Sequence, residues 1–340
     1  MILSRAVVQM LFIRVFECEH QNQHFSSSVI EYLGNAPAAS KALLGRFWIE
    51  IRIHGSVVAE PPAIFLGSVS AQSMRMQIRR RIKSMIRPIF FRLYRTAIRS
   101  QCWYWDRTNT DHYVNGLPVP PAMLRFRVGE TASVETFFAV GNNTARIIQA
   151  ALETTGKPIE NLNSILDFGC GCGRTLMWLA KSIPGKEFYG TDVDGSSIRW
   201  CRTNLPFATF SNNAPLPPTA YQDATFDLVY AVSVLTHLNE DYQLTWLAEL
   251  HRILKPGGRL LLSVHGKHCW HGLSQDDLQI LEERGFLFKT SSKLHGLLPD
   301  WYHTAYHSRE YVMRRFSSSF SVLTYMEAGL GCQDLVVLER

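Results

Sequence analysis

The sequence lacks the marks of a disulfide-stabilised or a membrane-spanning protein. Its seven cysteines are odd in number and scattered, and only the pair at 170 and 172 is closely spaced. A disulfide framework is therefore not expected, and a reducing compartment fits the sequence better. No apolar run reaches the roughly 18–20 residues that cross a bilayer, so we expect a cytoplasmic protein. The cysteines are Cys18, Cys102, Cys170, Cys172, Cys201, Cys269 and Cys332.

Acidic residues are missing from one long stretch of the chain. Between Arg75 and Arg99 there are nine basic residues and no acidic one, although the net charge of the whole chain is only +6. The rest is therefore mildly acidic, and we expect no nucleic-acid partner. Apolar residues recur between the arginines at roughly helical spacing, with Pro88 as a break or kink. Such a segment is typical of a peripheral membrane contact through 75–99, and equally of a helix that packs on its own domain.

The chain divides into three parts by pattern. Residues 1–73 show no sustained period, which predicts a poorly ordered extension. Met74 and Met76 stand directly before the basic segment, so it is open whether residues 1–73 belong to the natural protein. Residues 74–130 combine the basic segment with an aromatic and proline-rich stretch, which we interpret as a connector or lid. We expect one domain over 131–340.

Strand and helix patterns alternate after residue 164, which predicts right-handed crossovers and a mostly parallel sheet. A helix with Ser133 as its N-cap comes before them and continues to Leu152. Two apolar runs near the C-terminus predict an antiparallel hairpin. The expected strands are 164–168, 187–191, 208–211, 226–232, 258–265, 320–327 and 334–338, and the expected helices between them are 174–182, 196–204 and 242–254.

Residues 165–175, "ILDFGCGCGRT", hold three glycines and two cysteines in one turn. A metal site is not favoured, because the cysteines have CxC spacing and the histidine-rich stretch 265–271 follows a different strand. A redox pair is not favoured either, because the CxxC spacing at a helix start is missing. Between a strand and a helix, glycines let bare backbone approach a ligand at a helix N-terminus. A dinucleotide motif needs its third glycine at 174, where Arg174 stands, which argues against NAD or FAD.

The next predicted strand ends in two acidic residues. A carboxylate at such a strand tip can accept hydrogen bonds from both hydroxyls of a ribose. We assign Asp192 to this role and Asp194 or Ser196 to capping the following helix.

Taken in order, these motifs resemble the class I S-adenosylmethionine-dependent methyltransferases, and among them the small-molecule-type bacterial branch. The likeness rests on "LDFGCGCGR", "YGTDVD", "ATFDLVYAVSVLTHL", "ELHRILKPGGRLLLSVHG" and the terminal hairpin, and covers about residues 131–340. It implies an α/β fold with a Rossmann-like, mostly parallel seven-stranded sheet. Helices would cover both faces, and an antiparallel hairpin would close the sheet. S-adenosylmethionine is the implied cofactor, with no metal.

The resemblance also implies roles for individual residues. Asp167 would hold the methionine amino group, Asp192 the ribose hydroxyls, and Ser233 would line the methionine end. The turn after the third strand has asparagines where an acidic residue often contacts adenine, so Asn212 or Asn213 would substitute. The glycine turn would wrap round the cofactor through Gly169, Cys170, Gly171 and Gly173, with Cys170 and Cys172 as small residues that fit it.

Two histidines are candidates for a general base. His237 and His265 both lie just past the carboxyl ends of central strands, where ligands bind in such sheets, although each could instead brace its turn. The expected reaction is methyl transfer to an oxygen or nitrogen of a small-molecule or glycan-related acceptor. The alternatives are an inactive cofactor-binding protein and a peripheral membrane or assembly factor that uses 75–99. The oligomeric state is open.

Overall fold

The structure is a computed structural model that describes residues 71–292, 295–298 and 302–340. The chain forms two compact units, Met1–Met85 and Ile86–Arg340. Residues 1–70, and with them nearly all of the expected N-terminal extension, lie outside the described residues. In the part that is described, no helix combines the length and apolarity needed to cross a bilayer.

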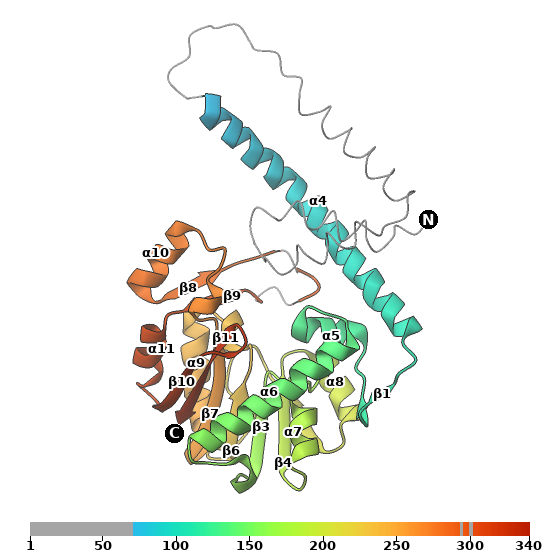
Figure 1. Cartoon of the computed structure of the whole chain (residues 1–340), viewed down its shortest axis with the longest axis vertical. Helices are drawn as coiled ribbons and strands as arrows, with labels where there is room; N and C mark the ends of the chain where they lie inside the picture. The colour runs from blue at the N-terminus through green and yellow to red at the C-terminus, as the bar shows by residue number, and fades with distance from the viewer. Residues whose placement is uncertain (1–70, 293–294, 299–301) are drawn as a thin grey trace, which may run out of the picture. The chain divides into compact units, whose positions relative to one another are not determined.

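The first described element is the long helix α4, Ala71–Thr108. Figure 1 draws α4 as one continuous helix. Pro88 lies inside it, so of the break or kink that we expected there, the break is wrong. Proline removes only its own backbone hydrogen bond and disturbs one turn, and the turns on either side keep their bonds. The helix also continues into the aromatic stretch that we interpreted as a connector.

Seven strands form the central sheet, in the order β10-β11-β7-β6-β3-β4-β5. The pairs from β7 to β5 are parallel, whereas β10 and β11 run antiparallel and close one edge. The predicted fold, including the terminal hairpin, is confirmed. The strands are β3 Ser164–Phe168, β4 Glu187–Asp192, β5 Ala208–Asn212, β6 Phe226–Ala231, β7 Leu254–Val264, β10 Ser321–Leu330 and β11 Gln333–Glu339.

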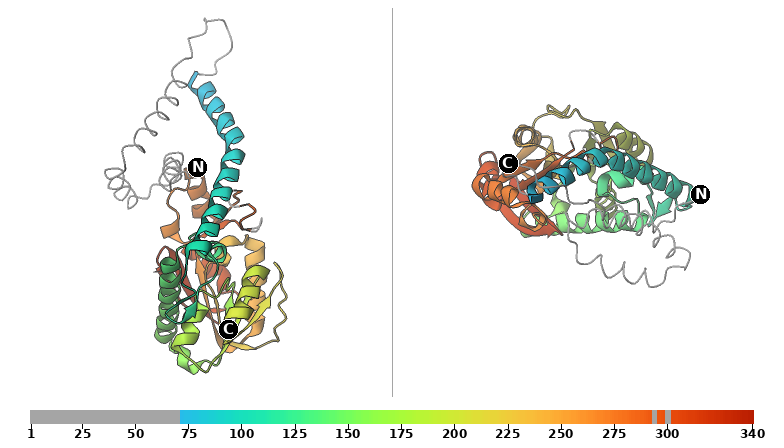
Figure 2. Two further views of the ribbon diagram at one scale, coloured as in Figure 1. Left: turned by 90° about the vertical axis from the view of Figure 1, so that its right-hand side faces the viewer. Right: turned by 90° about the horizontal axis from the view of Figure 1, so that it is seen from above.

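Helices cover both faces of this sheet (Figure 2) because alternate strand residues point to opposite sides. Ile165 of β3 belongs to the apolar core under α6–α8, and its neighbour Leu166 belongs to the core under α9 and α11. The helices are α6 Val134–Thr154, α7 Leu176–Ser182, α8 Gly195–Asn204, α9 Glu240–Ile253 and α11 Arg309–Phe316.

The helix starts follow the capping residues of the sequence. The Ser133 side chain accepts a hydrogen bond from the Thr136 backbone N–H at 3.1 Å, which confirms the predicted N-cap of α6. Asp194 does the same for α8 by accepting from the Ser196 N–H at 2.9 Å, so the first of our two capping candidates holds the position.

Several short elements escaped the sequence analysis. A small hairpin turns at Asn115-Gly116, where both residues have positive φ, as this dipeptide favours. The helix after it, α5, ends directly before α6 and contributes to the site described below. The short elements are β1 Tyr113–Val114, β2 Leu117–Pro118, α5 Ala122–Gly129, η1 Ile159–Asn161, η2 Leu235–His237, η3 Lys267–Cys269, α10 Gln275–Arg284, β8 Phe286–Lys289 and β9 Thr304–His307.

Candidate active site

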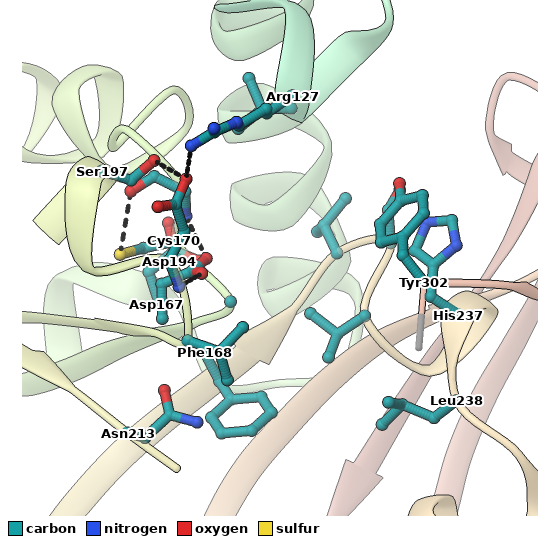
Figure 3. A pocket seen from close by; sticks show the side chains of 18 of the residues that line it. Arg127, Asp167, Phe168, Cys170, Asp194, Ser197, Asn213, His237, Leu238 and Tyr302 are labelled. Carbon is teal, nitrogen blue, oxygen red and sulfur yellow. Dashed lines mark hydrogen bonds and ion pairs between the residues drawn. The ribbon is translucent and has the colours of Figure 1, made fainter. Parts of the chain in front are cut away.

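A pocket opens at the carboxyl ends of β3, β4 and β6, with an empty volume of about 1240 Å³ when its mouth is included. This is the position at which ligands bind in open α/β sheets. Figure 3 shows Arg127, Asp167 and Asp194 on one side of the pocket and His237 and Tyr302 on the other. Cys170 of the glycine turn lies on the same side as Asp167 and Asp194, so this side of the pocket combines a glycine-rich backbone turn with charged groups.

The glycine turn has a backbone that only glycine adopts easily. Gly169 and Gly171 have φ of +78° and +52°, and a Cβ atom on either would collide with Val234 or Val128, respectively. Both glycines line the pocket, as does Cys170. Gly173 does not line it; this glycine packs against Leu205 of the helix α8 region.

The two cysteines of the turn are buried, neutral side chains. Burial raises the pKa of the Cys170 and Cys172 thiols well above the ordinary value, so neither is a thiolate near pH 7. Thiolates are the form that binds metal and attacks disulfides. Within the described ranges, no three His, Cys, Asp or Glu side chains are placed to hold a metal ion together.

Asp167 and Arg174 bring an acidic and a basic side chain to the pocket beside the glycine turn. Burial raises the pKa of Asp167 to about 8, opposed by Tyr230 and reinforced by Asp192, so an empty site holds mostly the protonated acid. Arg174 lines the pocket and is largely buried, yet its guanidinium makes no hydrogen bond or ion pair with any described residue. A zwitterionic amino-acid group matches this pair, because its ammonium suits Asp167 and its carboxylate suits Arg174.

Asp192 stands at the tip of β4 and is held by backbone donors. Its carboxylate accepts hydrogen bonds from the Gly171 N–H and the Asp194 N–H, each at 2.7 Å. Burial raises the pKa of Asp192, and these two donors oppose that rise. Each oxygen keeps a further lone pair, so the group can still accept from the hydroxyls of a ribose. Asp194 also pairs with Arg127 of α5 at 2.8 Å.

Asn213 and Ser233 both line the pocket. The Thr191 hydroxyl donates to the Asn213 side-chain oxygen at 3.0 Å, whereas Asn212 is exposed and lies outside the pocket wall. Ser233 has a φ of +58°, and its hydroxyl donates to the Gln333 side chain at 3.0 Å. A non-glycine residue in this backbone region is uncommon and costs free energy, and such residues cluster at functional sites.

The two candidate histidines occupy different places. His237 lines the pocket, stacks on Tyr302 at a centroid distance of 3.7 Å and has its Nδ1 2.7 Å from the His303 carbonyl oxygen. Nδ1 therefore carries the proton and donates, which leaves Nε2 with a lone pair. Burial lowers the pKa of His237 to about 4, so the ring is neutral at pH 7. His265 is not part of the pocket lining; its Nδ1 lies 3.0 Å from the Ala305 carbonyl oxygen.

The sequence analysis missed several residues of the pocket wall. Arg127 and Val128 come from α5, Leu298 from the segment before β9, and Trp246 from α9. Helical spacing predicted α9 but not which of its residues faces a ligand. Arg174 could have been found from the sequence, because it is a charged residue directly after the last glycine of the turn.

The fold and the pocket together indicate the class of protein to which this domain belongs. Residues 166–260 match the family model of a methyltransferase domain. The chain therefore carries a class I S-adenosylmethionine-dependent methyltransferase domain, and S-adenosylmethionine is the methyl donor of this class.

Individual relatives share only part of the chain. An uncharacterized methyltransferase of Synechocystis is 30% identical over 121 residues, which are 33% of this chain and 55% of that protein. A trans-aconitate 2-methyltransferase of Variovorax paradoxus is 31% identical over 107 residues, covering 32% of this chain and 40% of that protein. Thus the chain spans about half or less of these two curated relatives. Among solved structures, an S-adenosylmethionine-dependent methyltransferase from Methanosarcina mazei is 21% identical, with a TM-score of 0.40, and covers 52% of this chain and 92% of that one.

Proposed function

We propose that this protein transfers a methyl group from S-adenosylmethionine to an oxygen or nitrogen atom of a small organic acceptor, glycan-related molecules included. The observation that carries the proposal is that the pocket lining brings buried Asp167, Asp192 and Arg174 together at the glycine turn, and that Arg174 makes no ion pair with any residue that the structure describes. The relative named as a trans-aconitate 2-methyltransferase supports a small acceptor, and a relative from Aspergillus sclerotiorum named as an O-methyltransferase supports an oxygen acceptor.

The residues present fit the cofactor. Asp167 and Arg174 would hold the amino and carboxylate groups of its methionine part, and Asp192 its ribose hydroxyls, with Asn213 near the base and Ser233 at the methionine end. When bound, S-adenosylmethionine supplies an activated methyl group on a sulfonium. The protein's own contribution is to place the acceptor in line with that group, which is worth up to about 7–11 kcal/mol in favourable systems.

His237 is the candidate base for an acceptor that must lose a proton. Its neutral ring is fixed by the His303 carbonyl and by stacking on Tyr302, so its Nε2 lone pair is held in one orientation. His265, which points its Nδ1 to Ala305, is better suited to brace the chain after β7. We therefore assign the base role to His237 alone.

Calorimetric titration with S-adenosylmethionine tests the function. We expect binding by the unmutated chain and at least tenfold weaker binding by Asp192→Asn, because the amide cannot accept from two hydroxyls and the backbone together. Asp276→Asn, an exposed position on α10, is the matched control and should bind like the unmutated chain. No binding by the unmutated chain would end the proposal. Binding without transfer of labelled methyl to any acceptor would indicate an inactive cofactor-binding domain instead.

A second role, docking to an anionic membrane, is supported by the outer side of α4 within the second unit. Ile89, Leu93, Trp103 and Tyr104 are each 58–65% exposed, and at 100° per residue they fall on one side of the helix. Arg107 lies over the Trp103 ring at 4.3 Å, and Arg92 and Arg99 are exposed nearby along the helix. Exposed apolar and aromatic residues flanked by arginines are typical of helices that lie in a membrane interface.

Sedimentation with vesicles tests this second role. We expect the full chain to sediment with phosphatidylserine-containing vesicles at low salt and not with phosphatidylcholine alone. Replacing both Trp103 and Tyr104 by alanine should weaken sedimentation, whereas Tyr113→Ala, another exposed aromatic, should not. Equal sedimentation with both vesicle types, or with neither, contradicts docking.

A further inference from the structure

Two cysteines outside the pocket lie together although they are 63 residues apart. Cys269 ends η3, and Cys332 lies in the turn between β10 and β11. The β11–β7 ladder, which pairs Asp334 with Val264, brings this turn beside the residues that follow β7. The Cys269 thiol donates a hydrogen bond to the Cys332 carbonyl oxygen at 3.0 Å.

These are the two accessible thiols of the described chain. Cys332 is exposed and Cys269 is partly exposed, whereas the other four described cysteines are buried. The adjacent Cys269 thiol lowers the pKa of Cys332 to about 6, with help from the backbone N–H groups of Cys332 and Gln333. Burial and the Asp334 carboxylate act in the opposite direction. The same contact raises the pKa of Cys269, so the two thiols are chemically different.

We propose that Cys332 and Cys269 form a thiol-disulfide exchange site, with Cys332 as the attacking thiol and Cys269 as the resolving thiol. The Cys332 thiolate attacks one sulfur of a small disulfide such as oxidised glutathione, and the other half leaves as a thiolate. The Cys269 thiol then loses its proton and attacks the Cys332 sulfur, which releases the second glutathione thiolate. The protein gains one disulfide, and the small disulfide is reduced to two thiols.

The Cys269–Cys332 site is linked to the pocket by the side chain of Gln333. Gln333, the next residue, accepts hydrogen bonds from the hydroxyls of Ser233 and Ser263, at 3.0 and 2.7 Å. Ser233 lines the pocket. A Cys269–Cys332 disulfide would tie the turn directly before Gln333 to the end of η3.

Peptide mass spectrometry of the full chain tests the site. The reduced, folded protein is incubated at pH 7 with oxidised glutathione, quenched with acid and digested without reductant. We expect a cross-linked pair of peptides that contains Cys269 and Cys332, and no lasting glutathione adduct. In Cys269→Ser, which keeps a hydroxyl donor but cannot resolve, the adduct should persist on Cys332.

Buried thiols in the same sample serve as the control. Cys102, Cys170, Cys172 and Cys201 should remain free, which shows that the chain stays folded. In Cys332→Ser, Cys269 should react at least tenfold more slowly than Cys332 does in the unmutated chain. The proposal is overturned if the unmutated chain forms no cross-link, if its Cys332 keeps the adduct as the variant does, or if the cross-link forms only in urea. None of these readouts depends on methyl transfer.

Discussion

Asp167 lowers the stability of the folded chain at neutral and alkaline pH, because its carboxyl is buried. A carboxyl with a pKa near 8 in the folded chain and about 3.9 when unfolded binds an extra proton in the folded state between these values. The free energy of unfolding therefore falls as pH rises through this window, by up to about 1.4 kcal/mol per unit. A cationic ligand group beside Asp167 would remove the conflict by favouring the charged form.

Asp167→Asn should be more stable than the unmutated chain at pH 8 and differ much less at pH 4. The amide has no proton to lose, so it avoids the burial of a charge. Thermal unfolding across pH 4–8 measures the difference. Asp227→Asn is the control of opposite sign, because hydrogen bonds from the Ser164 N–H and Lys255 outweigh burial and lower the pKa of Asp227 to about 2. This variant should lose stability at pH 7, and a stability difference for Asp167→Asn that does not change with pH contradicts the argument.

His237→Gln should separate binding from transfer. The amide keeps a donor to the His303 carbonyl but lacks a basic nitrogen, so the rate of methyl transfer should fall by about 10²-fold or more. The affinity for S-adenosylmethionine should stay within twofold. The measurement is incorporation of labelled methyl into acceptors of a cell extract, with calorimetry alongside. Because the pKa of His237 is about 4, its contribution should be constant from pH 5.5 to 8; an unchanged rate in the variant would remove His237 as the base.

At the scale of the elements, the glycine turn places two demands on the same residue. Gly171 has a positive φ, and a Cβ there would also meet Val128 of α5. Gly171→Ala should therefore lower the free energy of unfolding by more than the roughly 1 kcal/mol that a positive φ alone costs. Gly156→Ala is the matched control, with a φ of +74° and no atom within 4 Å of the added carbon.

Urea unfolding of both variants, each with and without Val128→Ala, separates the cost of the positive φ from the cost of the collision with Val128. Removing the valine methyl groups should restore part of the stability of Gly171→Ala and none of that of Gly156→Ala. Equal losses in the two glycine variants would mean that Val128 moves aside without cost.

Sequence pattern was most reliable where burial alone decides the structure. Strand β3 was predicted to the residue and β4 to within one, because a strand buried on both faces reads as an apolar run between turn residues. The assignment of Asp192 to the ribose hydroxyls stays a prediction, which rests on the position of this residue at the end of β4. By contrast, α5 and the α10–β9 region were missed, since short elements bury few side chains and leave little periodicity. Arg127 reaches the pocket through a tertiary contact with Asp194, and such contacts leave no local signal.

On the scale of the whole second unit, the pocket joins distant parts of the chain. Arg127 of α5 pairs with Asp194 beside β4, and Tyr302 stacks on His237 after β6. Binding of S-adenosylmethionine should therefore slow hydrogen exchange in peptides covering 122–129 as well as in the glycine turn. Peptides from α10, which has no residue in the pocket wall, should be unaffected. Protection confined to the glycine turn would show that α5 does not respond to the ligand.

The origin of the pocket walls has a consequence for how such a protein diversifies. The strands and turns that carry Asp167 and Asp192 fall within residues 166–260, the part that matches the family model. Arg127, Val128, Leu298 and Tyr302 come from before and after it. Changes in these flanks can therefore reshape part of the pocket wall without altering the segment that carries Asp167 and Asp192.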